Sequence, residues 1–263
     1  MTKVLTCIKS GFVRQYVIYY SCYEQINHHF YKEFQLHYLR NYWLKALFLM
    51  RDHGFFVTIK KAFYVLYRDL QEWRFDFSRN VDTRGLVTHP QESDNPLHLT
   101  AMPYDATTPM LFREIMKMTR GMELPTAFFD MGCGKGRVLM MAAEHGFYDI
   151  TGVEFAEPLA HAAEENIARY LRKKNWQSVN IDVVHCDAAT YSFPDKNAVI
   201  FFYNPFAESL MAKTLQNIRS SARLNRQRYI IYHTAFFDDL VGNPAEYALL
   251  LKTDNYSVYR MIL

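Results

Sequence analysis

The second half of the chain alternates between short apolar segments and amphipathic ones, and this alternation limits the fold more than any other feature of the sequence. The apolar segments have the length and the aromatic and β-branched content of buried strands: 127–131, 148–155, 179–187, 198–204 and 228–234. The amphipathic segments repeat apolar residues at helical spacing: 137–146, 158–174 and 208–221. This pattern predicts βαβ units, in which a parallel sheet carries helices on both faces. The closing stretch, 247–262, predicts an antiparallel hairpin at the edge of the sheet.

Three glycines occupy alternate positions directly after the first of these strands. Gly132, Gly134 and Gly136 follow Asp130 and precede a helix-forming run, and they are three of only ten glycines in the protein. Glycine serves where the backbone must adopt a positive φ or let a ligand come close. A strand, a glycine-rich turn and a helix start also present free backbone N–H groups to a nucleotide-like cofactor. We therefore predict a cofactor site at this turn.

Acidic residues end the next two strands as well. Glu154 closes the second strand, 22 residues after Gly132, and Asp187 closes the third. With Asp130, they place three carboxylates along the carboxyl edge of the sheet, where open α/β folds bind ligands. Glu154 can accept hydrogen bonds from both hydroxyls of a ribose, and Phe155 beside it can pack on an adenine.

The spacing of the glycines distinguishes two cofactor classes. A dinucleotide-binding turn reads G-x-G-x-x-G, whereas this chain reads D-M-G-C-G-K-G from Asp130 to Gly136. That order resembles the first motif of class I S-adenosylmethionine-dependent methyltransferases, whose turn cradles the methionine end of the cofactor. The resemblance implies that Asp187 accepts a hydrogen bond from the adenine amino group. It also implies a Rossmann-like, mostly parallel seven-stranded sheet.

A second motif follows the fourth strand. Asn204, Pro205 and Phe206 resemble the N/D-P-P-Y/F motif of amino-directed methyltransferases, although the second proline is missing. In that motif, side-chain and backbone oxygens hold a nitrogen nucleophile in line with the methyl group, and the aromatic ring packs beside it. The resemblance therefore implies that these three residues are catalytic.

The resemblance extends to a bacterial group of class I methyltransferases of mostly undefined substrate, distantly similar to the non-SET histone-lysine methyltransferases. That group carries D-T-x-G, Y-x-P-T, G-S-G-K-G-R and Y-N-P-F elements, which match VDTRG, PYDATTP, GCGKGR and FFYNPF here. The resemblance covers about Arg74 to Ile262. This chain has Cys133 in place of the serine of G-S-G-K-G-R and Ala106 in place of the proline of Y-x-P-T. In related enzymes the region of Tyr104 and Thr107 folds over the methionine end as a lid. The cofactor-binding residues that the resemblance implies are Tyr104, Thr107, Asp130, Gly132, Gly134, Lys135, Gly136, Glu154, Phe155, Asp187, Ala188 and Asn204.

Three further residues have roles that the sequence leaves open. Lys135 and Arg137, at the glycine turn, either hold the carboxylate of the cofactor, attract an anionic substrate, or form a solvated basic helix start. His233, at the end of the fifth strand, is either a general base or a packed core histidine. Neither the histidines nor the four cysteines have the spacing of a metal site, so no metal is predicted.

The first 80 residues differ in composition from the rest. They hold 12 Lys and Arg against 6 Asp and Glu, together with 20 aromatic residues. We predict a helical N-terminal region (1–77), a linker or lid loop (78–103) and the cofactor-binding domain (104–263). The basic, aromatic-rich region is compatible with packing on the domain or in a homo-oligomer, with binding of an acidic protein or nucleic acid, and with peripheral contact to an anionic membrane. Because no run reaches the roughly 18 apolar residues of a membrane span and no signal peptide is evident, a cytoplasmic location is predicted.

These features favour a methyltransferase that uses S-adenosyl-L-methionine and methylates a nitrogen of a protein side chain or of a small amine. Two alternatives come from other classes: a NAD(P)-dependent oxidoreductase, and a non-catalytic module that binds S-adenosylmethionine. The spacing of the glycines and the Asn204-Pro205-Phe206 motif argue against the oxidoreductase.

Overall fold

A computed structural model describes residues 54–85, 104–176, 178–203, 207–223, 225–233, 238–241 and 243–262. The chain divides into two compact units between Leu66 and Tyr67. Helix α3 (Phe55–Arg79) begins directly after Gly54 and contributes to both units. Most of the predicted N-terminal region and of the predicted lid loop lies outside the described residues, so these predicted domain limits stay predictions.

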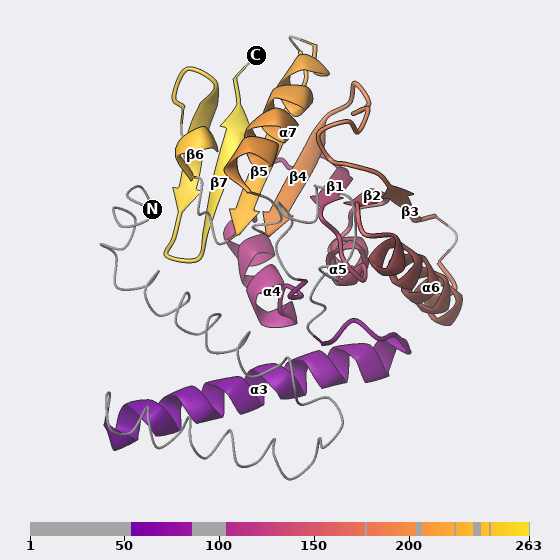
Figure 1. The fold of residues 1–263 in the computed structure, drawn as a ribbon, viewed down its shortest axis with the longest axis vertical. Coiled ribbons are helices and arrows are strands. Elements are labelled where there is room, and N and C mark those ends of the chain that lie inside the picture. The colour runs from indigo at the N-terminus through magenta and orange to yellow at the C-terminus, as the bar shows by residue number, and fades with distance from the viewer. Residues whose placement is uncertain are drawn as a thin grey trace. The chain divides into compact units, whose positions relative to one another are not determined.

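The second unit is built on one seven-stranded sheet. Its strands are β1 (Ala127–Met131), β2 (Asp149–Glu154), β3 (Asn180–His185), β4 (Ala198–Tyr203), β5 (Arg228–His233), β6 (Tyr247–Lys252) and β7 (Tyr256–Met261). They lie in the order β3-β2-β1-β4-β5-β7-β6, which Figure 1 shows from right to left. The first five are parallel to one another, and β7 pairs antiparallel with both β5 and β6. The predicted parallel sheet and its closing antiparallel hairpin are therefore confirmed.

Helices cover both faces of this sheet, as predicted (Figure 1). They are α4 (Pro109–Met118), α5 (Arg137–Glu144), α6 (Glu157–Lys174), α7 (Glu208–Ser220) and the short α8 (Asp238–Val241). One core lies between the sheet and α4, α5 and α6, and the other lies under α7 and α8. Because successive residues of a strand point to opposite faces, Phe128 joins the first core and Phe129 the second, and Phe201 and Phe202 divide in the same way.

The start of α4 shows how the local sequence sets an element boundary. The Thr108 hydroxyl accepts a hydrogen bond from the Leu111 N–H at 3.3 Å, and Pro109 occupies the first turn. Proline is suited to this place because the first N–H groups of a helix have no partner within it. Thr108 is therefore the N-cap of α4. Within the described part of the chain, no helix is long and apolar enough to cross a membrane.

The direction of the strands determines where a ligand can bind. The chain passes from β1 to β2 and β3 on one side, and reaches β4 and β5 on the other side of β1. Ligands of open α/β sheets bind outside the carboxyl ends of the strands at such a reversal. This edge carries the residues at or just after Met131, Glu154, His185, Tyr203 and His233.

Candidate active site

The glycine turn joins β1 to α5 in a conformation that only glycine adopts readily. Gly132, Gly134 and Gly136 have φ angles of 86°, 52° and 82°, all in the left-handed region. The Gly132 and Cys133 N–H groups donate to the Val153 carbonyl at 2.8 and 3.1 Å, which holds the turn against β2. The prediction that the backbone itself requires these three glycines is thus confirmed.

The Glu154 carboxylate is held by two backbone N–H groups, one of which belongs to the glycine turn. Its side chain ends β2 and is 7% exposed. Oε2 accepts a hydrogen bond from the Gly134 N–H at 2.8 Å, and Oε1 accepts one from the Ala156 N–H at 2.8 Å. The two bonds fix the orientation of the carboxylate and tie the end of β2 to the glycine turn.

Two neighbouring groups are buried beside this carboxylate. Burial, and to a lesser degree the charge of Glu154, raise the pKa of Asp130 well above its usual range, so Asp130 keeps its proton to higher pH than an exposed aspartate. Burial also raises the pKa of the Cys133 thiol. Gly152 leaves room for this thiol, because a Cβ there would lie 2.6 Å from the Cys133 Sγ.

Tyr104 lies over the glycine turn, in agreement with its predicted location. A Cβ at Gly134 would lie only 2.1 Å from Cε2 of the Tyr104 ring, and the Tyr104 hydroxyl donates to the Thr83 carbonyl at 2.7 Å. The next residue, Asp105, accepts a hydrogen bond from the Tyr203 hydroxyl at 3.1 Å. The segment 104–108 thereby connects the glycine turn to the end of β4. Within this segment Thr107 is buried, and its predicted contact to the cofactor stays a prediction.

Residues 81–85, with the sequence VDTRG, form a second segment over the turn, which we call the strap. The strap backbone at Asp82 exchanges hydrogen bonds with the Asn166 side chain of α6, both at 2.9 Å. The Lys135 ammonium donates to the Arg84 carbonyl at 2.8 Å. Lys135, predicted to contact the cofactor, therefore has a partner in the strap.

The strap is anchored from beneath by a buried polar network. Thr83 donates to the Asp76 carboxylate through its N–H at 3.1 Å and through its hydroxyl at 2.5 Å. Arg137, which is 1% exposed, donates to the Thr83 hydroxyl at 2.7 Å and to Glu72 at 3.3 Å. Since Arg137 is buried and engaged by these groups, the alternative of a solvated basic helix start is wrong for this residue.

The other residues predicted to contact the cofactor follow the ends of β2 and β3. The Asp187 Oδ1 accepts from the Ala189 N–H at 2.9 Å, so this carboxylate caps its own turn, and Ala188 beside it is buried. The Phe155 carbonyl lies 3.0 Å from Nε2 of His185. The structure thus brings Phe155 and Asp187 to the same edge as Glu154, and their roles towards a cofactor stay predictions.

The ends of β4 and β5 carry a stacked pair. The Tyr203 and His233 rings lie 4.1 Å apart at an interplanar angle of 24°. Burial lowers the pKa of His233 to about 3, so the imidazole is neutral and weakly basic at physiological pH. Of the two alternatives for His233, the packed histidine is the one that the structure supports. The predicted catalytic residues Asn204, Pro205 and Phe206 follow Tyr203 directly and lie outside the described residues.

Sequence reasoning missed Asp76 and Thr83 as parts of the site. Thr83 lies in the VDTRG element, which carried a resemblance but no assigned role, and Asp76 lies outside it. The network joins residues 54 positions apart, Thr83 and Arg137, and such long-range partners leave no local pattern. Within the described ranges, no group of three His, Cys, Asp or Glu side chains could hold a metal ion.

Part of the chain matches the sequence model of a known family. Residues 128–224 match the sequence model of a family described as a methyltransferase domain. That range holds the glycine turn, Glu154 and Asp187, and runs past the end of β4. No curated protein matches the chain.

Several solved structures resemble the fold at low sequence identity. TrmN from Thermus thermophilus is 14% identical over 59% of this chain and 49% of its own, with a TM-score of 0.45. A ribosomal protein L11 methylase from Lactobacillus delbrueckii subsp. bulgaricus is 13% identical over 57% of this chain and 76% of its own, with a TM-score of 0.41. An S-adenosylmethionine-dependent methyltransferase from Thiobacillus denitrificans, in complex with S-adenosyl-L-homocysteine, is 20% identical over 47% of this chain and 48% of its own, with a TM-score of 0.37.

The family match and the strand order agree on one assignment. The matched residues begin in β1 and include the strand-turn-helix unit with its three left-handed glycines. The sheet has the mixed, seven-stranded, Rossmann-like form that the motifs implied. Residues 128–224 therefore match a methyltransferase domain and lie on a sheet of Rossmann-like strand order.

Proposed function

We propose that the protein is an enzyme that transfers a methyl group from S-adenosylmethionine to a nitrogen atom of a protein side chain or of a small amine. The observation that carries this proposal is the register of β1 and β4. Met131 pairs with Phe202, so the ends of β1 and β4 lie side by side, and these are the strands that the glycine turn and the Asn204-Pro205-Phe206 motif follow in the sequence. A cofactor turn and an amine-holding motif in this relation would bring nucleophile and methyl group together.

The donor groups of the turn suit the cofactor. The buried Glu154 carboxylate is already oriented by two backbone N–H groups, and a carboxylate can accept hydrogen bonds from a ribose diol in addition. The left-handed glycines leave the backbone without side chains on the approach to the turn. We assign the ribose to Glu154, the adenine to Phe155 and Asp187, and the methionine end to the turn and Tyr104.

The reaction demands little chemistry from the protein. The bound cofactor supplies an activated methyl group on a positively charged sulfur. The chain must hold an amine in its neutral form close to that carbon, and positioning of this kind can supply about 7–11 kcal/mol of the barrier. The Tyr104 and Tyr203 rings border the space between the turn and β4, and an apolar border lowers the pKa of an amine by desolvation.

The proton of the amine has to leave by another route than His233. An imidazole with a pKa of about 3 is too weak a base to deprotonate an alkylammonium group efficiently. A mechanism in which the amine loses its proton to water when it is desolvated, before the methyl transfer, agrees better with a neutral His233 than general-base catalysis does. His233 then supports the Tyr203 ring by stacking.

The test uses full-length protein, S-adenosylmethionine with a labelled methyl group, and cell extract separated into protein, small-molecule and nucleic-acid fractions. Label should enter protein or a small amine, and mass spectrometry should place it on nitrogen. Asn204→Ala should remove this transfer while the Kd for S-adenosylhomocysteine changes by only a few-fold. Label on oxygen or in nucleic acid alone would overturn the proposed acceptor. Binding of the cofactor without transfer to any fraction would favour the non-catalytic module.

A further inference from the structure

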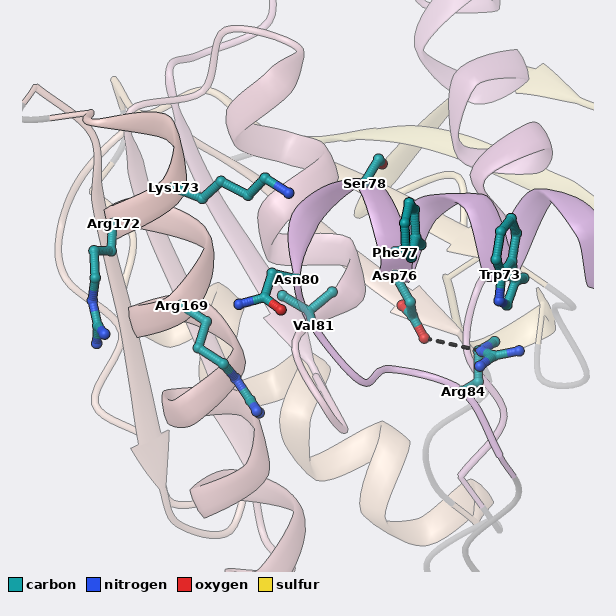
Figure 2. Close-up of a pocket in the computed structure, with 10 residues that line it drawn as sticks. All are labelled: Trp73, Asp76, Phe77, Ser78, Asn80, Val81, Arg84, Arg169, Arg172 and Lys173. Carbon is teal, nitrogen blue, oxygen red and sulfur yellow. Dashed lines mark hydrogen bonds and ion pairs between the residues drawn. The ribbon is translucent and has the colours of Figure 1, made fainter.

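Residues of α3, of the strap and of α6 line a concave surface. It is a pocket of about 840 Å³ between the C-terminal end of α3 and the last two turns of α6. Figure 2 shows Trp73 and Phe77 on α3 as one wall, and Arg169, Arg172 and Lys173 on α6 as the other. Residues 81–84 of the strap join the two walls. No assignment made above uses this pocket.

The α3 wall carries two exposed aromatic side chains (Figure 2). The Trp73 and Phe77 rings are stacked, with centroids 5.1 Å apart and an interplanar angle of 11°. Trp73 is 48% exposed and Phe77 is 72% exposed, so the pair keeps a wide area in contact with solvent. Because the two rings stack on each other, a further planar group can stack on the outer face of either ring.

The opposite wall is basic. Among the described residues, no ion pair involves Arg172 or Lys173, while Arg169 interacts with Glu165 at 3.5 Å. In Figure 2 the Lys173 side chain reaches towards the end of α3, and the Arg172 side chain points away from it. The helix dipole favours basic residues in the last turn of α6. It does not account for Lys173, which lines the pocket and reaches towards the helix that carries the stacked rings (Figure 2).

The acidic group in the pocket does not cancel this charge. Asp76 is buried and accepts hydrogen bonds from Thr83 and from Arg84, whose Nε lies 3.2 Å away. Arg84 is itself half exposed beneath Trp73 (Figure 2). The accessible charges of the pocket are therefore positive.

We propose that this pocket binds single-stranded nucleic acid, with unpaired bases stacked on Trp73 and Phe77 and the phosphates next to Lys173 and Arg172. Stacking requires bases that are free of a complementary strand, and every base has a face that can stack. Cations spaced along the facing helix match a phosphate backbone, which a small apolar ligand would not need. The proposal concerns binding, and it stands whether or not nucleic acid is also the methyl acceptor.

The strap places this site next to the proposed transfer site. The Arg84 side chain lines the pocket, while its carbonyl accepts the hydrogen bond from Lys135 at the glycine turn. A strand held here would contact the residues that line the pocket, none of which is assigned to the cofactor. Nucleic acid and S-adenosylhomocysteine should therefore bind the full-length protein at the same time.

The test is fluorescence anisotropy of labelled oligo(U) of about 12 nucleotides with the full-length protein. Trp73→Ala and Phe77→Ala should each weaken binding by about 5- to 150-fold, the equivalent of one lost stacked base. Trp73→Phe should bind nearly as well as the wild type. Arg172→Ala/Lys173→Ala should reduce the slope of log Kd against log salt by about 1.4, since each phosphate contact on a single strand contributes about 0.7.

A charge-matched control is Lys117→Ala/Lys213→Ala, on the exposed surfaces of α4 and α7. It should keep the oligo(U) affinity, and all variants should keep the Kd for S-adenosylhomocysteine, which shows that they fold. Three results would overturn the proposal. The alanine variants could bind oligo(U) with the affinity of the wild type, or inorganic polyphosphate could displace the labelled oligo(U) as well as unlabelled oligo(U) does at the same phosphate concentration. The third result is tighter binding to phosphatidylserine vesicles through the same residues. Failure of methyl transfer would not affect it, and loss of oligo(U) binding would not affect the transfer assay.

Discussion

The Tyr104 ring occupies the space that any side chain at Gly134 would need, with Cε2 only 2.1 Å from the position of a Cβ. The contact is reinforced because the Tyr104 hydroxyl is held by the Thr83 carbonyl at 2.7 Å. The ring therefore cannot swing aside without breaking a bond to the strap. Gly134 and Tyr104 together define how closely a ligand can approach the turn.

Gly134→Ala should consequently weaken S-adenosylhomocysteine binding and destabilise the protein. A residue with a Cβ at a φ of +52° costs about 1–3 kcal/mol of backbone strain. The clash with the Tyr104 ring adds to this cost. Gly121→Ala is the matched control, because Gly121 has a φ of +99° but nothing lies within 4 Å of its Cβ position. In calorimetry, the control should bind like the wild type. A double-mutant cycle with Tyr104→Ala should show coupling of about 0.5–3 kcal/mol, and strictly additive effects would contradict the contact.

Glu154→Gln should weaken binding of S-adenosylhomocysteine by about 10- to 150-fold, since hydrogen bonds to a charged group contribute about 1.5–3 kcal/mol. The amide would also turn an N–H donor towards the Gly134 or Ala156 N–H group, both of which now donate to the carboxylate. Asp187→Asn should cost less, because one predicted contact to the adenine amino group is lost. Calorimetry on both variants checks the order. Unchanged binding in a folded Glu154→Gln protein would remove the ribose assignment.

The strands and most helices could be predicted from the sequence because their signals are local. AFFDM is β1 from Ala127 to Met131, and the hairpin around Asp254 forms as the turn residues indicated. Apolar residues repeat with a period of two in strands and of 3.6 in helices, because these spacings turn the side chains towards a core. The repeats do not depend on how the individual side chains pack. The glycine turn was equally readable, because a positive φ demands a particular residue type.

The polar network under the strap could not be predicted in the same way. Asp76, Thr83 and Arg137 come from a helix, a loop and the start of another helix, and nothing in a charged residue's neighbours tells whether it will be buried. The sequence left the role of Arg137 open between a binding contact and a solvated helix start, and the fold encloses this side chain. Its partners are fixed only after the sheet has assembled. Such contacts follow from tertiary packing, not from residue spacing.

This network makes Asp76 a structural requirement of the site. Asp76→Asn should lower the free energy of unfolding by about 1.5–3 kcal/mol, because it weakens charge-assisted hydrogen bonds to Thr83 and Arg84. The affinity for S-adenosylhomocysteine should fall as well, since binding must then order the strap. Urea unfolding and calorimetry measure the two effects. Asp69→Asn on the same helix, in an exposed pair with Arg68, should change stability by at most about 1 kcal/mol, and equal losses in the two variants would contradict the role of the network.

His233 should make the protein less stable in mild acid. Its pKa of about 3 in the folded state lies below the value of about 6.5 expected in the unfolded chain, so between these values only the unfolded state takes up the proton. The stability is full above pH 6.5 and falls by about 1.4 kcal/mol for each pH unit below it, or about 2 kcal/mol between pH 7 and pH 5. His233→Phe, which keeps a ring to stack on Tyr203, and His233→Gln, which keeps a polar group, should both lack this loss in urea unfolding at the two pH values. If either variant lost stability in parallel with the wild type, another group would be responsible for the acid sensitivity. A neutral His233 at the end of β5, stacked on Tyr203, would then no longer be supported.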